Sequence, residues 1–97
     1  MTDTIKPFDI ASHLNSDADI QAFMHETTQH GDASDFIHAL SIAARARGMS
    51  EVARQAGVSR ASLYKSLNDS ANPKFETVYK VCQALGVRLL VSPPVAI

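Results

Sequence analysis

Residues Met49 to Asn68 are Met-Ser-Glu-Val-Ala-Arg-Gln-Ala-Gly-Val-Ser-Arg-Ala-Ser-Leu-Tyr-Lys-Ser-Leu-Asn. The first half carries small or branched apolar residues at helical spacing: Val52, Ala53 and Ala56. Gly57 can take the left-handed conformation that ends a helix, and Ser59 can cap a second helix. Two short helices joined by so tight a turn must cross steeply. This is the geometry of a helix-turn-helix that reads DNA.

The second helix of this pair has two different sides. Its inner side is apolar and comprises Val58, Leu63 and Leu67. Its outer side presents Arg60, Ala61, Tyr64 and Lys65 on one face. Ala53 lies where the two helices cross, so a side chain larger than methyl would push them apart.

The outer side chains suit nucleic acid. Arg60 can donate two parallel hydrogen bonds to guanine, Ala61 can touch a thymine methyl, and Lys65 can contact a phosphate or a guanine. Tyr64 offers a ring and a hydroxyl, and Ser59 offers a hydroxyl and helix N-terminal N–H groups to a phosphate. The alternative is a plain pair of helices in a bundle, with Arg60 and Lys65 merely solvated.

The chain resembles a known family at these positions. Residues 49–68 resemble the helix-turn-helix of lambda-Cro-like repressors. A longer run, roughly residues 7 to 91, resembles the HigA-like addiction-module antidote proteins. The matching motifs are Pro7-Phe8-Asp9, Ala44-Arg45-Ala46-Arg47-Gly48, Asn72-Pro73-Lys74-Phe75 and Ala84-Leu85-Gly86-Val87-Arg88-Leu89. The resemblance implies a mainly all-α fold: a five-helix lambda-repressor-like DNA-binding domain with an N-terminal helical extension and a short C-terminal β-strand.

Length and charge agree with one small DNA-binding unit. The 97 residues suffice for one domain with a modest core. Residues 1–44 carry one lysine and seven carboxylates, whereas residues 45–97 carry eight basic groups and three carboxylates, although the net charge is only −1. This asymmetry predicts a basic surface for DNA and an acidic surface for another partner. We therefore divide the chain into residues 1–31, an arm and helix that are the candidate toxin-binding region, and residues 32–97, the helix-turn-helix domain with its strand.

The N-terminal half is expected to form an arm and two helices. Residues 1–8 predict an extended arm, and Asn15 or Ser16 should cap a helix from about Asp17 to the stop at Gly31. Asp32 should open the next helix, which ends before Gly48. Its last turn contains Arg45 and Arg47, which suit either the helix carbonyls or a DNA phosphate.

A polar loop and another helix follow the helix-turn-helix. The resemblance implies that the loop from Asn68 to Lys74 approaches the DNA backbone through Asn72 and Lys74; the alternative is an ordinary solvated turn. Residues 75–85 predict an amphipathic helix stopped by Gly86. Lys74 stands where related repressors often have a capping serine.

Residues 87–91, Val-Arg-Leu-Leu-Val, predict a short strand bounded by Gly86 and Pro93-Pro94. A single strand cannot satisfy its own backbone groups, so it must pair with the N-terminal arm or with a second copy. We therefore expect a homodimer with two reading helices about 34 Å apart on DNA.

No pattern for catalysis, a metal or a cofactor is found. His13, His25, His30 and His38 form no metal-binding motif, and no nucleophile elbow or phosphate loop is present. Cys82 is the only cysteine and falls on an apolar stripe, so it is expected to be buried. Because no convergent catalytic groups are found, we expect a protein that is not an enzyme. The absence of a signal sequence or membrane span predicts a cytosolic protein that binds no membrane.

These observations favour a type II antitoxin. Such a protein would bind double-stranded operator DNA as a dimer, repress its own operon and neutralise a RelE/ParE-like toxin; the toxin follows from the resemblance and the charge asymmetry. One alternative is a stand-alone Cro-like transcriptional repressor without a toxin partner. Another is a protein-interaction domain that has lost DNA binding.

Overall fold

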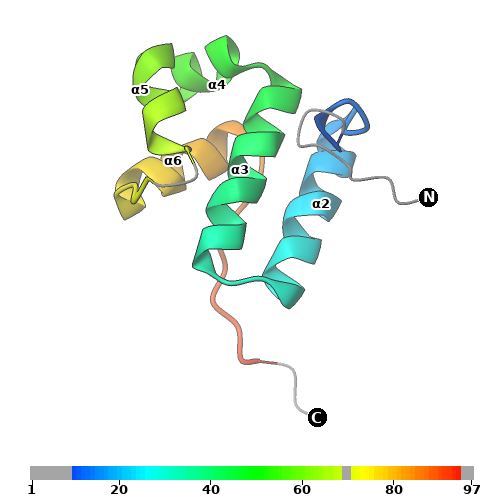
Figure 1. Cartoon of the computed structure of the whole chain (residues 1–97). Helices are drawn as coiled ribbons and strands as arrows, with labels where there is room; N and C mark the ends of the chain where they lie inside the picture. Colours follow the sequence, from blue (N-terminus) through cyan, green and yellow to red (C-terminus); the bar gives the residue numbers. More distant parts are fainter. Residues whose placement is uncertain (1–9, 69–70, 95–97) are drawn as a thin grey trace, which may run out of the picture.

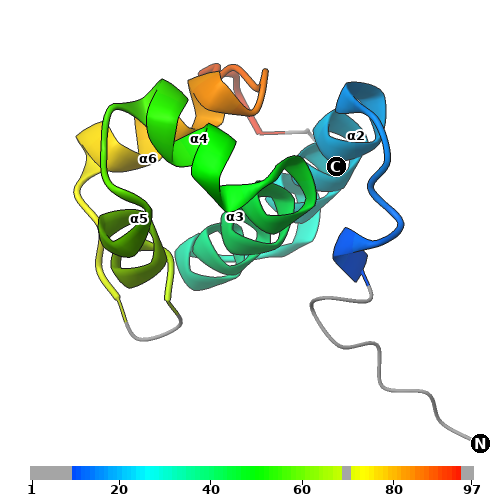
Figure 2. The same ribbon diagram turned by 90° about the horizontal axis from the view of Figure 1, so that it is seen from above.

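The fold, a computed structural model, is mainly helical and is described over residues 10–68 and 71–94. The helices in this part of the chain are α2 (Asp17–His30), α3 (Ala33–Arg47), α4 (Met49–Ala56), α5 (Arg60–Ser66) and α6 (Phe75–Ala84). The α2 and α3 helices lie antiparallel, and α4, α5 and α6 pack on the other side of α3 (Figures 1 and 2). The predicted helix order is therefore confirmed for these residues.

Side-chain caps start the first two helices. The Ser16 hydroxyl accepts a hydrogen bond of 3.1 Å from the Asp19 backbone N–H, which confirms Ser16 rather than Asn15 as the cap of α2. Asp32 and Asp35 cap α3 reciprocally, because each carboxylate accepts a hydrogen bond from the other residue's backbone N–H. Both acids lie at the N-terminus of the helix dipole, where negative charge is stabilising.

Two glycines in the left-handed conformation, Gly57 and Gly86, end α4 and α6. Gly57 has φ +75°, and its N–H donates to the Arg54 carbonyl, while the Val58 N–H donates to the Ala53 carbonyl. This pair of bonds is the Schellman motif. Gly86 ends α6 with the same conformation and the same two-bond pattern. Both predicted stops are confirmed, and they determine where the chain leaves each helix.

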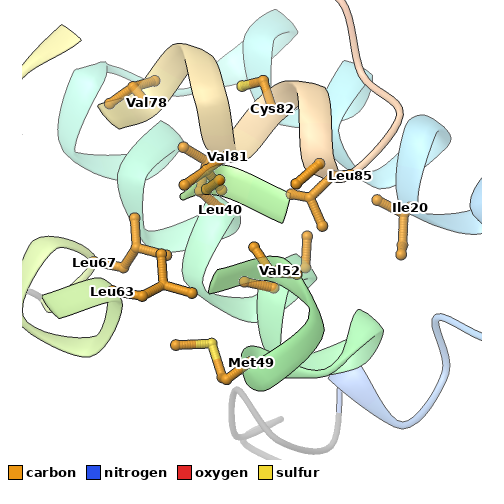
Figure 3. Close-up of a cluster of buried hydrophobic side chains, with 14 of the residues drawn as sticks. Ile20, Leu40, Met49, Val52, Leu63, Leu67, Val78, Val81, Cys82 and Leu85 are labelled. Atoms are coloured by element: carbon orange, nitrogen blue, oxygen red, sulfur yellow. The ribbon is translucent and has the colours of Figure 1, made fainter. Parts of the chain in front are cut away.

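One hydrophobic core joins the described helices (Figure 3). Leu40 of α3, Val52 of α4, Leu63 of α5 and Val81 of α6 are all fully buried. The α2 helix contributes Ile20 and Met24, which belong to the same cluster. The N-terminal helix is therefore part of the same folded unit as the rest of the described chain.

The strand predicted for residues 87–91 is not formed in the described part of the chain. Val87 and Leu89 are half-buried against the core, whereas Leu90 is 75% exposed and Val91 is fully exposed. A strand needs a hydrogen-bonded neighbour, and the described residues of this chain contain no second strand to provide one. The N-terminal arm at residues 1–8, which was one predicted neighbour, lies outside the described residues.

Arg47 links three helices. Its Nη1 donates to the Ala84 carbonyl at 3.1 Å, and its Nη2 donates to the Leu85 carbonyl at 3.2 Å and pairs with the Asp17 carboxylate. Of the two roles predicted for Arg47, the structure thus supports binding of helix carbonyls, although they belong to α6 rather than to its own helix. Arg45, two residues earlier, is exposed.

Within the part of the chain that is described, no helix combines the length and the apolar character needed to cross a membrane.

Candidate nucleic-acid interface

The corner between α4 and α5 orients the second helix. The Ser59 hydroxyl accepts a hydrogen bond of 3.0 Å from the Ser62 N–H and so caps α5. Leu63 and Leu67 are buried at 0% and 2% exposure, and Val58 packs against the core. With its apolar side held by these contacts, α5 must turn its other side toward solvent. The axes of α4 and α5 cross steeply (Figure 1).

The seven residues predicted to contact DNA are all exposed. They lie at the start of α5, along its outer face and in the following loop: Ser59, Arg60, Ala61, Tyr64, Lys65, Asn72 and Lys74. Ala53, predicted to lie under the crossing helix, is 3% exposed. The burial pattern of α5 therefore has the two-sided form that its sequence predicts.

Arg60 and Tyr64 form a contact that was not among the predictions from the sequence. The guanidinium carbon of Arg60 lies 5.6 Å from the centre of the Tyr64 ring, within the range of a cation–π interaction. Their separation of four residues on one helix is the pattern from which this contact could have been predicted.

The loop before α6 borders a hollow. This space, of about 520 Å³, is lined by the start of α3 and by the loop and first turn of α6, including Asn72, Pro73 and Phe75. Lys74 stands at the N-cap of α6 and makes no capping side-chain hydrogen bond. The first N–H groups of α6 therefore have no side-chain cap, as expected from a lysine at this position.

The outer side of α4 carries an ion pair of its own. The Glu51 carboxylate accepts hydrogen bonds from Arg54 and from the Gln55 amide, the latter at 2.7 Å. The hydrogen bond from Arg54 lowers the pKa of the Glu51 carboxyl, and the same contact raises the pKa of Arg54. The positive charge of Arg54 is thus balanced within α4.

The described carboxylates of the N-terminal half all take part in a hydrogen bond or an ion pair. Asp32 and Asp35 cap α3, Asp17 pairs with Arg47, and Asp19 accepts the Asn15 N–H at 3.0 Å. Glu26 lies 3.2 Å from the His30 ring nitrogen, with both side chains more than 70% exposed. Asp17, Asp19, Asp32 and Asp35 lie at helix starts, whereas Glu26 lies inside α2. Asp17 and Glu26 still expose about 70% of their side chains.

A groove lies beside the C-terminal segment. It has a volume of about 1000 Å³ and is lined by one face of α2, by Phe36 and by residues 86–94. The Gln21 side-chain amide donates to the Gly86 carbonyl at 3.3 Å at one part of this lining. The groove was not among the predictions, because its two sides, residues 21–36 and residues 86–94, are at least 50 residues apart in the chain.

Cys82 is buried as predicted, at 1% exposure. Burial raises the pKa of its thiol to about 11. Among residues 10–68 and 71–94, no group of three or more histidine, cysteine or acidic side chains is arranged to hold a metal ion.

Comparison with known families gives the context for this surface. Residues 4–93 match the family model described as "Probable addiction module antidote protein". The chain belongs to this antidote family. A relative from Haemophilus influenzae, described only as an uncharacterized protein, is 45% identical to this family member over 91 residues, which cover 94% of each chain. No solved structure matches the sequence.

Proposed function

We propose that the chain is the antitoxin of a type II toxin–antitoxin system, that it binds operator DNA through α5 and represses its own operon. The observation that carries the proposal is the orientation of α5: its buried leucines and capped start leave Arg60, Tyr64 and Lys65 exposed on one face. In this reading α4 and α5 are a helix-turn-helix of the lambda-Cro-like, HigA-like type. Membership of the antidote family supports the antitoxin role.

The proposed contacts divide into two kinds. Arg60 and Ala61 would lie against base edges, where guanine and the thymine methyl give sequence readout. Ser59, Lys65, Asn72 and Lys74 would hold phosphates, with the uncapped N-terminus of α6 adding N–H donors beside Lys74.

We further propose that the DNA-binding form is a homodimer. Leu90 and Val91 support this arrangement, because they leave apolar surface in water beside a groove lined by residues 86–94. Substituting both by serine should reduce self-association in sedimentation experiments without loss of helical signal. An unchanged dissociation constant would exclude these residues from the dimer contact.

The proposed toxin is a basic protein of the RelE/ParE-like class, held by residues 1–31 and the exposed acids of α2. Co-expression with the product of the adjacent reading frame, followed by size measurement, tests this step. A stable complex would support the antitoxin role. DNA binding without formation of such a complex would support the stand-alone repressor.

DNA binding is tested with the upstream region of the chain's own gene. Arg60→Ala should weaken specific affinity by about 1–3 kcal/mol. Lys65→Ala should lower the slope of log affinity against log salt by about one. Lys80→Ala is the matched control, because Lys80 is also an exposed helical lysine but lies on α6 and pairs with Glu76 at 3.6 Å. Equal binding by all three variants would refute the proposed reading face.

A further inference from the structure

Two of the arginines in this fold donate to internal acceptors, and Arg60 has a different kind of neighbour. Arg47 donates to two α6 carbonyls, and Arg54 donates to the Glu51 carboxylate. The contact described for Arg60 is with the face of an aromatic ring, that of Tyr64. A ring holds a guanidinium without supplying a hydrogen-bond acceptor in the plane of its donors.

This difference matters for recognition of a base. The guanidinium has a rigid, planar set of donors that matches the O6 and N7 acceptors of guanine. A free arginine side chain loses rotamer freedom when it is immobilised at an interface, and a side chain that is already restrained loses less. The Tyr64 ring is anchored on α5, whose inner face is buried through Leu63 and Leu67.

We propose that Tyr64 is a positioning residue: its ring holds the Arg60 guanidinium ready for a guanine in each operator half-site. This inference rests on the proposed function of α5, and it specifies guanine as the base that Arg60 contacts. Arg60 and Tyr64 then act as one unit for base choice, whereas Lys65 supplies charge without base choice.

The test compares operator affinities of four single variants, Arg60→Ala among them, and of the double variant that combines Arg60→Ala with Tyr64→Leu. Tyr64→Phe keeps the ring and should bind within about 2-fold of the wild type. Tyr64→Leu removes the ring and should bind about 2–5-fold more weakly, as expected for an exposed cation–π contact. The control is Tyr79→Leu, which changes an exposed tyrosine of α6 and should leave affinity unchanged. Thermal unfolding of each variant shows whether the fold is intact.

Coupling distinguishes positioning from a direct contact of Tyr64 with DNA. If Tyr64 acts through Arg60, Tyr64→Leu should cause no further loss of operator affinity in an Arg60→Ala background. In the otherwise wild-type protein, Tyr64→Leu should also reduce the preference for the operator over a DNA in which the contacted guanine is replaced. Full additivity, or an equal loss in Tyr64→Phe and Tyr64→Leu, would overturn the positioning role.

The contact is also measurable without DNA. The ring current of Tyr64 should shift the Arg60 side-chain protons in NMR spectra of the free protein, and Tyr64→Leu should abolish that shift. A wild-type protein that binds no operator refutes the proposed function and this inference with it. Operator binding that is insensitive to the loss of the ring refutes the inference alone.

Discussion

Arg47 donates a hydrogen bond of 3.1 Å from Nη1 to the backbone carbonyl of Ala84, 37 residues away in the chain. The last carbonyls of a helix lack partners within the helix itself. Arg47 supplies donors to two of them at the end of α6, while its side chain remains only 23% exposed. The end of α3, the end of α6 and the start of α2 are therefore joined at one side chain.

Replacing Arg47 by methionine should lower the free energy of unfolding by about 1–3 kcal/mol, because partly buried carbonyls lose their donors. Urea denaturation followed by helical circular dichroism measures the change. Arg45→Met is the matched control on the same turn and should stay within about 0.5 kcal/mol, since Arg45 is exposed. Equal effects of the two substitutions would show that the contacts with α6 add no stability.

Leucine at position 53 should disrupt the packing of α4. Ala53 is 3% exposed, so the added atoms have no free space, and overpacking of this kind costs about 1–3 kcal/mol. Thermal unfolding measures the loss. The same substitution at Ala22, an exposed position of α2, should be nearly neutral. A stable Ala53→Leu protein with unchanged DNA affinity would contradict close packing around Ala53.

Alanine at Gly57 should destabilise the corner by roughly 1–2 kcal/mol through its backbone conformation alone. The residue has φ +75°, and an added Cβ would meet no atom within 4 Å, so steric contact with neighbours makes no contribution. Asparagine tolerates this conformation better and should cost less than alanine. Urea denaturation of the two variants measures the order, and a greater loss for asparagine would contradict the backbone explanation.

The Cys82 thiol should react slowly in the folded protein. Its pKa is raised from 9.0 to about 11, so at mildly alkaline pH its thiolate fraction is about 100-fold smaller than in the unfolded chain. Modification with a thiol reagent, compared with and without urea, measures this difference. Similar rates in the two conditions would mean that Cys82 is accessible in the native state.

The same pKa shift predicts a pH dependence of stability. Between pH 9 and about 11 the unfolded thiol ionises while the folded thiol stays protonated. The unfolded state then binds fewer protons than the folded state. The contribution of the Cys82 thiol to the free energy of unfolding is therefore fully present below pH 9 and is lost as the pH rises toward 11. Cys82→Ala, compared with wild type across this range, should flatten that part of the curve. An identical decline in both proteins would assign the loss to other groups.

Features with a local cause could be predicted from the sequence. Ser16 and Asp32 start helices because their side chains reach N–H groups three residues ahead. Gly57 and Gly86 end helices because a left-handed backbone suits glycine. The two-sided character of α5 follows in the same way from helical spacing.

Features that depend on distant segments could not be predicted in this way. The partners of Arg47 lie 30 to 38 residues away, and the sequence alone left its role open between two alternatives. The segment at residues 87–91 has the composition of a strand, but strand formation depends on a neighbour that composition does not supply. The groove beside it exists only once α2 has packed in place.

Because α2 contributes Ile20 and Met24 to the common core, the helix and the rest of the described chain are thermodynamically linked. A ligand that binds α2 only in the folded state, at 100 times its dissociation constant, would stabilise the entire cooperative unit by about 2.7 kcal/mol. Amide exchange should then slow in α5 as well as at the occupied helix. Binding of a ligand to α2 would thus be detectable as slower amide exchange in α5.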